Sequence, residues 1–179
     1  MEESNNKTAT VMVVSGDMDK VLVAFIVATG FASMGVQTKM WFTMYGANCL
    51  KRRRGLLHSW FHRPAKETQP YRRMDTDTFL QKGFEMLNRG GPGYLPLSRH
   101  NLFGLGPLIL NYILKRKGIP NVEQFIQLAE ELGISFTICQ ICVDALALDT
   151  SDLVASDVNV KGVAQYMKDA MDSHYNIVL

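Results

Sequence analysis

Two cysteines stand three residues apart in the stretch ICQICVDALAL, which runs from Ile138 to Leu148. Cys139 directly follows ISFTI, a run rich in β-branched and aromatic residues that predicts a strand. A thiol at the junction of a strand and a helix lies beside unpaired backbone amides, which favour the nucleophilic thiolate. The alternative is an inert buried thiol, because free cysteine is among the most buried residue types. We predict that Cys139 does chemistry.

Cys142 lies about one helical turn after Cys139, which allows the two sulfur atoms to face each other. Such a CxxC pair is typical of dithiol oxidoreductases and supplies half of a zinc site. Its surroundings do not resemble a thioredoxin motif, and Cys142 opens the apolar stretch VDALAL, which favours core packing. Neither Cys49 nor the pair His58 and His62 completes a recognised set of four zinc ligands. We expect no metal.

Positive charge is concentrated in the middle of the chain, although the net charge is only +2. KRRR spans Lys51 to Arg54, and Arg63, Arg72 and Arg73 follow it. A near-neutral balance without a basic, aromatic-studded face argues against nucleic acid as a partner. A solvated helix end is the default interpretation, and steering of an acidic protein or small oxyanion toward Cys139 is the alternative. SGDMD, from Ser15 to Asp19, is no GxGxxG or Walker loop, so no nucleotide site is predicted.

Strands and helices alternate in the N-terminal part of the sequence. The apolar, β-branched run from Thr8 to Gly16 predicts a strand buried on both faces, and Gln37 to Met44 predicts a second strand. The apolar stretch from Val21 to Gly35 predicts a buried helix, since it is too short to cross a bilayer comfortably. Strand, helix and strand in this order predict a right-handed parallel crossover.

The C-terminal half continues the alternation. Helices are predicted at 107–118 and 121–133, a strand at 134–138, a short strand at 152–156, a helix at 161–173 and a closing strand at 174–179. The predicted fold is an open, mostly parallel α/β sheet with helices on both faces.

Chemistry in such sheets gathers beyond the carboxyl ends of the strands. Three segments share that edge in the predicted fold, namely SGDMD, MYGANC and CQIC. Cys139 and Cys142 lie in the last of these segments. The three segments and the residues just after CQIC also contain the accessory candidates Ser15, Asp17, Asn48, Cys49, Gln140 and Asp144.

The chain is predicted to form one domain over residues 1–179, since it is long enough to bury a core without disulfides. Residues 1–7 indicate a flexible polar tail, and residues 55–106, which lack a strand set of their own, indicate an insertion or lid. The N-terminus has no secretory series, so we expect a cytoplasmic protein that is not inserted in a membrane. Three cysteines in a reducing compartment favour reactive thiols over structural disulfides.

Five segments, taken together and in this order, resemble the DsrE/DsrF/DrsH-like family of sulfur-relay proteins, and most closely its DsrE-like subgroup associated with sulfur oxidation. They are VMVVSGDMDKVLVAF, MWFTMYGANCLK, LPLSRHNLFGLGP, LGISFTICQICVDALAL and KGVAQYMKDAMDSHYNIVL. The resemblance runs from about Thr8 to Leu179 and is weakest from Arg52 to Tyr71, so it gives no role to the arginines there or just after. It implies a compact α/β sandwich that assembles into homo- or hetero-oligomers.

The resemblance also implies a function. Family members carry sulfur on a cysteine as a persulfide or thiosulfonate and exchange it with TusA-like carriers and rhodaneses. The matching cysteine is Cys139, and Gln140 and Asp144 fit the CQxxxD pattern of the subgroup. Cys142 falls where relatives usually have a small non-cysteine residue, which leaves a resolving or second-carrier role open.

We therefore expect a cytoplasmic sulfur carrier or sulfurtransferase that needs no cofactor. Two alternatives stay open. One is a dithiol oxidoreductase using Cys139 and Cys142, which would form a reversible disulfide. The other is a non-catalytic oligomeric module with an unreactive Cys139.

Overall fold

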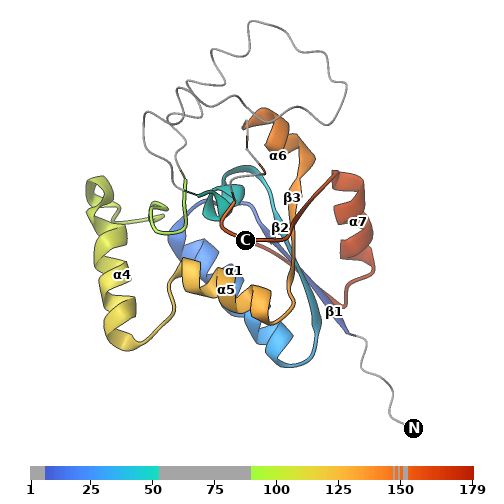
Figure 1. Ribbon diagram of the computed structural model, residues 1–179, viewed down its shortest axis with the longest axis horizontal. Helices are drawn as coiled ribbons and strands as arrows, with labels where there is room; N and C mark the ends of the chain where they lie inside the picture. The colour runs from blue at the N-terminus through green and yellow to red at the C-terminus, as the bar shows by residue number, and fades with distance from the viewer. Residues whose placement is uncertain (1–6, 53–89, 147, 149, 151–152) are drawn as a thin grey trace, which may run out of the picture.

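The computed structural model describes residues 7–52, 90–146, 148, 150 and 153–179 (Figure 1). Its strands are β1 (Thr8–Val13), β2 (Gln37–Phe42), β3 (Ser135–Cys139), β4 (Val158–Lys161) and β5 (Tyr175–Val178). Its α-helices are α1 (Met18–Ser33), α4 (Leu105–Lys117), α5 (Val122–Glu131), α6 (Gln140–Ala145) and α7 (Val163–Met171). Two 3₁₀ helices, η1 (Met44–Leu50) and η2 (Leu102–Gly104), complete the described elements.

The five strands form one parallel sheet in the order β4-β3-β2-β1-β5. In the register, Val13 pairs with Phe42, and Phe42 pairs with Ile138. The carboxyl ends of the strands therefore lie at one edge of the sheet, and the predicted open α/β fold is confirmed.

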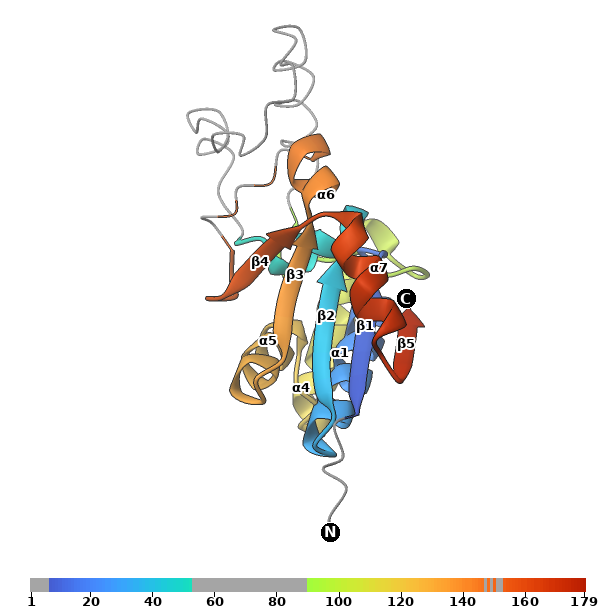
Figure 2. The ribbon, with the colours of Figure 1, turned by 90° about the vertical axis from the view of Figure 1, so that its right-hand side faces the viewer.

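Helices cover both faces of the sheet (Figure 2). From β1 to β3 the chain moves across the sheet in one direction, and α1 and α5 lie on one face. From β4 to β5 it returns in the opposite direction, and a right-handed crossover then places α7 on the other face. The handedness rule alone thus accounts for the two helical layers.

Aromatic packing anchors α1 to its face of the sheet. Phe25 of α1 lies with its ring centroid 6.1 Å from that of Phe42 and 6.2 Å from that of Phe136. The helix is buried on one side only, since Val23 is 47% and Ile26 50% exposed. The helix predicted in this stretch is present, but it is only half covered. Within the described ranges, no helix is long and apolar enough to span a membrane.

A charged network anchors α7 to the opposite face. The Asp169 carboxylate accepts hydrogen bonds from Lys39 Nζ at 2.8 Å, Trp41 Nε1 at 3.1 Å and Gln165 Nε2 at 3.2 Å. Burial raises the pKa of Asp169, but the hydrogen bonds from Lys39, Gln165 and Trp41 and the Lys39 charge together outweigh it. The pKa of this carboxyl therefore lies below its usual value.

The strand predicted at residues 152–156 is wrong. Leu153 makes only an isolated antiparallel bridge to Lys51, and Val154 N–H donates to Leu50 C=O at 2.8 Å. Leu153 and Val154 therefore lie alongside the end of η1 and are not part of the sheet. The fourth strand, β4, forms a few residues later, at Val158–Lys161. Of the predicted insertion at 55–106, residues 55–89 lie outside the described part of the chain.

We predict that Asp169→Asn lowers the free energy of unfolding by about 2 kcal/mol, because it removes a charged acceptor of three hydrogen bonds. The pKa of Asp169 is lower in the folded than in the unfolded chain, so its contribution is complete above the unfolded value and is lost as pH falls through the folded one. Urea unfolding at neutral and acidic pH measures both effects. Asp157→Asn, at an exposed position, is the matched control, and equal losses in both variants would contradict the prediction.

Candidate functional site

The ends of β1 and β2 are joined by close backbone contacts. Thr43 N–H donates to Val13 C=O at 3.0 Å, and Gly46 N–H donates to Val14 C=O at 2.9 Å. A Cβ atom added to Gly46 would lie 2.2 Å from the Val13 carbonyl oxygen. Only glycine permits this approach, so Gly46 fixes η1 against the end of β1.

Cys142 connects the same junction to α6. Its Sγ accepts a hydrogen bond from Met44 N–H at 2.9 Å and lies 3.1 Å from Thr43 Oγ1. Met44 has a φ of 47°, in the left-handed region, at the turn that begins η1. Cys142 is 1% exposed, so its sulfur is enclosed and held by groups that follow β2.

Cys139 occupies the position that the sequence predicts for it. It is the last residue of β3 and the N-cap of the six-residue helix α6, and it is 8% exposed. In the first turn of α6, Gln140 Nε2 donates to Asp144 Oδ1 at 3.0 Å. The CQxxxD residues thus lie together, with Gln140 and Asp144 bracing the helix that follows the thiol.

Lys161 is a site residue that the sequence analysis missed. It pairs with Cys139 in the register of β3 and β4, so the two residues lie side by side on neighbouring strands. Lys161 opens the helix predicted at 161–173, since the strand before it is predicted at 152–156 and not at Val158–Lys161. The alternating pattern of VNVK was the available signal.

Ser15 and Asp17 lie on the β1 side of the edge, two strands from β3. Ser15 Oγ donates to Asp17 Oδ2 at 2.9 Å, and Lys20 Nζ is 2.9 Å from the same carboxylate oxygen. These hydrogen bonds stabilise the start of α1, where acidic groups are favoured. The structure does not bring Ser15 and Asp17 together with Cys139 among the contacts of the described residues.

The loop before α4 is tied to the same end of α1. Asp19 accepts hydrogen bonds from Ser98 N–H at 3.0 Å and from Ser98 Oγ at 2.6 Å, and Met18 N–H donates to Pro96 C=O at 2.7 Å. Burial raises the pKa of Asp19, but the Ser98 hydrogen bonds outweigh it, and the pKa lies below its usual value.

Asn48 and Cys49 belong to the interior of the edge. The Asn48 backbone carbonyl accepts from Gly91 N–H at 2.8 Å, which attaches the described part of the predicted lid to η1. Cys49 is completely buried, and its Sγ–H donates to Gly46 C=O at 3.0 Å. Burial raises the pKa of the Cys49 thiol strongly. Cys49 is therefore a packing residue in this arrangement.

Apolar side chains near the two reactive-site candidates face outward. Met44 is 43%, Tyr45 46% and Ile141 61% exposed. Met44 contacts Cys142 through its backbone, and Ile141 lies between the two cysteines in the chain. Met44, Tyr45 and Ile141 therefore form a set of exposed apolar side chains at the same edge of the sheet as the nearly buried Cys139 thiol. We call this set the apolar collar.

All three cysteines lie in the described ranges as free thiols. Over those ranges, no group of three or more His, Cys, Asp or Glu side chains is arranged to hold a metal ion. His58 and His62 lie outside the described residues, as do Arg53, Arg54, Arg63, Arg72 and Arg73.

The model of the DsrE/DsrF/DrsH-like family matches residues 5–178. The chain is 28% identical to "Uncharacterized protein YrkE" of Bacillus subtilis (strain 168), over all of both chains. It is 23% identical to "Sulfur carrier protein DsrE2" of Allochromatium vinosum, with 93% of this chain and 94% of the relative covered.

A solved structure shares the fold. The ychN protein of E. coli superposes with a TM-score of 0.50 at 7% sequence identity, over 96% of this chain and 99% of that one. At this identity the similarity concerns the fold alone.

We predict that a thiol-alkylating reagent labels Cys139 of the folded protein faster than Cys49, because Cys49 is fully buried and its pKa is raised. Labelling of Cys49 should stay negligible between about pH 6 and 9 and become complete on unfolding. Peptide mapping after timed alkylation measures each cysteine in one sample, so each serves as the control for the other. Equal rates at both positions would contradict the assignment of Cys49 to the core.

Proposed function

The chain belongs to the DsrE/DsrF/DrsH-like family, and we propose that it holds sulfane sulfur on Cys139 and relays it between partner proteins. The main support is the position of Cys139, which ends β3 at the carboxyl edge of a parallel sheet. Cys139 is also the residue that the resemblance matches to the family's cysteine. The name of the Allochromatium relative, a sulfur carrier, supports the same function. The protein is then a sulfurtransferase-like carrier that needs no cofactor.

The proposed loading step is a thiol exchange. The Cys139 thiolate attacks the outer sulfur of a donor persulfide, a new S–S bond forms on Cys139, and the donor leaves as its thiolate. With tetrathionate, attack on a central sulfur breaks the central S–S bond, leaves a thiosulfonate on Cys139 and releases thiosulfate. Unloading is the same exchange with the thiolate of an acceptor. Each step conserves charge and needs no external oxidant or reductant.

Charge and access at the edge support this chemistry. Lys161 lies beside Cys139 in the sheet, and a cation favours both an attacking thiolate and an anionic adduct. Because Cys139 is only 8% exposed, a bound persulfide is shielded from unspecific thiols. The hydrogen bond from Met44 N–H and the contact with Thr43 Oγ1 hold the Cys142 sulfur one helical turn away from Cys139.

The partners that we propose are small thiol carriers of the TusA type, rhodaneses and related sulfur-oxidation proteins. Such a partner has to reach a recessed thiol, and the apolar collar of Met44, Tyr45 and Ile141 provides a surface for it. We place the exchange in the cytoplasm, where thiols stay reduced, and expect the carrier to be a homo-oligomer.

We predict that incubation with a persulfide donor or tetrathionate adds the mass of one sulfur atom or one thiosulfonate group to a single cysteine. The adduct should be absent from Cys139→Ser and retained by Cys142→Ser, because only Cys139 is the attacking thiol. Intact-mass spectrometry of the reduced protein measures it, and Cys49→Ser is the control for a buried thiol.

Full loading of Cys139→Ser would refute the proposal. Loss of two hydrogens that requires both Cys139 and Cys142 would instead establish the dithiol oxidoreductase. If wild-type protein takes up no adduct and Cys139 resists alkylation, the non-catalytic module is correct.

We also predict that Lys161→Gln slows loading from tetrathionate about fivefold at low salt. This factor corresponds to roughly 1 kcal/mol, the interaction energy of two unit charges at short range in water. The difference should shrink at high salt, because exposed charges are screened. Timed mass spectrometry at two ionic strengths gives the rates. Lys168→Gln, on the exposed surface of α7, is the matched control. Equal slowing in both variants would show that net charge alone is responsible.

A further inference from the structure

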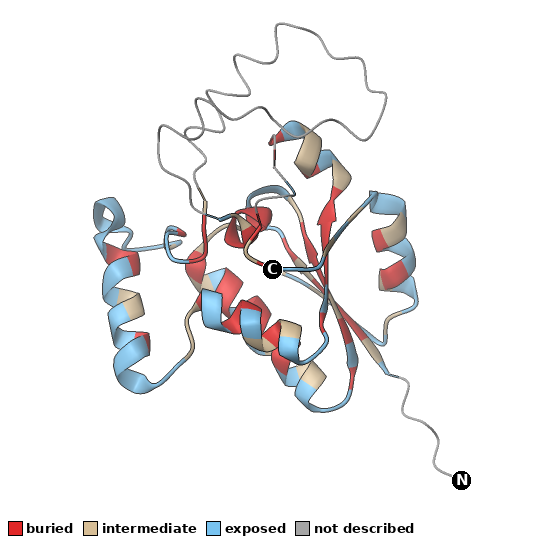
Figure 3. Ribbon diagram, in the orientation of Figure 1, coloured by how far each residue is buried: buried red, intermediate tan, exposed pale blue. Residues whose placement is uncertain are grey.

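The outer surface of α4 is an apolar patch, defined here as Phe103, Leu105, Leu108, Ile109, Tyr112 and Ile113. Phe103 is fully exposed and the other five are 47–61% exposed. Of the residues in α4, only Gly106, Pro107 and Leu114 are buried. Figure 3 shows α4 at the outer side of the helical layer, exposed over most of its length.

The size of the α4 patch is that of a protein interface. Six half-exposed or fully exposed leucine, isoleucine and aromatic side chains offer on the order of 700 Å², close to what one partner buries in a standard interface. The largest apolar patch of an ordinary monomer is smaller, at roughly 300–600 Å². A second chain of this kind would therefore have enough area for a stable dimer.

Phe103 lies in a segment with a strained backbone. His100, Leu102 and Phe103 have φ values of 58°, 43° and 56°, in the left-handed region that disfavours residues with a Cβ atom. Such conformations are unfavourable for residues with a Cβ atom and persist where surrounding contacts hold them. The fully exposed Phe103 ring gains little from its own chain, so contacts with a second molecule would offset the strain.

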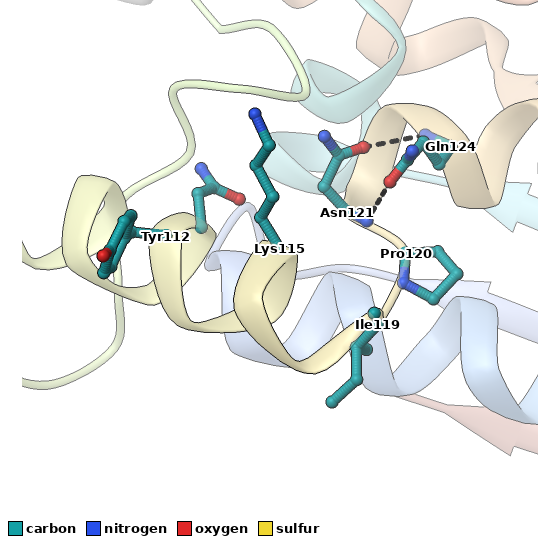
Figure 4. Close-up of a pocket in the computed structure, with 8 residues that line it drawn as sticks. Tyr112, Lys115, Ile119, Pro120, Asn121 and Gln124 are labelled. Carbon is teal, nitrogen blue, oxygen red and sulfur yellow. Dashed lines mark hydrogen bonds between the residues drawn. The ribbon is translucent and has the colours of Figure 1, made fainter.

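A cavity of about 540 Å³ lies at the other end of α4, where the chain turns into α5 (Figure 4). Tyr112, Lys115, Ile119 and Pro120 line one part of it. Asn121 and Gln124, which line it together with Asn111 and Gly118, exchange two hydrogen bonds of 3.0 and 2.9 Å that brace this wall. The lining is mixed: Tyr112, Ile119 and Pro120 offer apolar surface for an aromatic ring, and Lys115 offers a cation that can lie over the ring face.

We propose that two copies of this chain pair through antiparallel α4 helices, with Phe103 of each copy in the α4–α5 cavity of the other. Phe103 precedes α4 and the cavity lies at its end, about 20 Å away for 13 residues. An antiparallel pair brings each ring to the opposite cavity, and a two-fold interface makes both contacts at once. The cationic ends, Lys115 to Lys117, then lie apart.

This inference goes beyond the sulfur chemistry and does not rest on it. No residue of the α4 patch or the cavity belongs to the group around Cys139, so loading of Cys139 and dimer formation are measured independently. Failure of one leaves the other standing.

Sedimentation velocity of the full chain over a range of concentrations tests the pairing. We expect a dimer whose dissociation constant rises at least about tenfold in Phe103→Ala, as for a central aromatic anchor, and which is lost in Ile109→Glu. Met171→Glu changes a 79% exposed residue on α7 and should leave the dimer unchanged. Circular dichroism of each variant identifies any that fails to fold, and Tyr112→Glu then replaces it.

Cross-linking tests the geometry. In a Cys139→Ser background, the double variant Phe103→Cys, Ile119→Cys should form a disulfide-linked dimer under mild oxidation, and neither single variant should. A monomer at every concentration would overturn the proposal and leave the α4 patch to another segment of the chain or another protein. A dimer that is unaffected by Phe103→Ala and Ile109→Glu would overturn it as well.

Discussion

The close approach of η1 to the end of β1 is the constraint on which the rest of the edge depends. Because Gly46 has no Cβ, its backbone can lie against the Val13 carbonyl, and the turn at Thr43 and Met44 is set by that contact. Met44 then directs its N–H at Cys142, which holds the first turn of α6 against β2. Cys139 ends β3 at the start of that turn, so the helix that follows the thiol is tied through Met44 to the packing at the end of β1.

The two faces of the sheet are stabilised by different physical effects. On the α1 face, Phe25, Phe42 and Phe136 pack as tilted and edge-to-face rings, and burial of apolar area drives the packing. On the α7 face, Asp169 gathers donors from two elements and holds α7 against β2. α7 directly follows β4 in the chain, so the hydrogen bonds that hold α7 on the sheet also limit where β4 can lie beside β3.

The sequence predicts those parts of the fold that depend on local patterns. The runs that form β1, β2 and β3 are rich in β-branched and aromatic residues, and Asn121 with Gln124 forms the capping box at the start of α5. β4 has four residues of alternating exposure at the edge of the sheet, which is a weak strand signal. The apolar residues from Leu153 to Ala155 have a stronger signal, but Leu153 pairs only with Lys51. The contact of Cys142 with Met44 joins residues 98 positions apart and has no local signal.

The proposed pairing and the proposed relay are geometrically compatible. The loop before α4 is fastened to the start of α1 through Ser98 and Asp19, so the beginning of α4 lies at the carboxyl edge of the sheet (Figure 1). An antiparallel pair of α4 helices therefore places the two carboxyl edges at opposite ends of the dimer. Cys139 and the collar of Met44, Tyr45 and Ile141 belong to elements other than α4 and have no part in the α4 patch. A carrier that receives one partner and then another needs both thiols accessible, and an arrangement of this kind leaves them so.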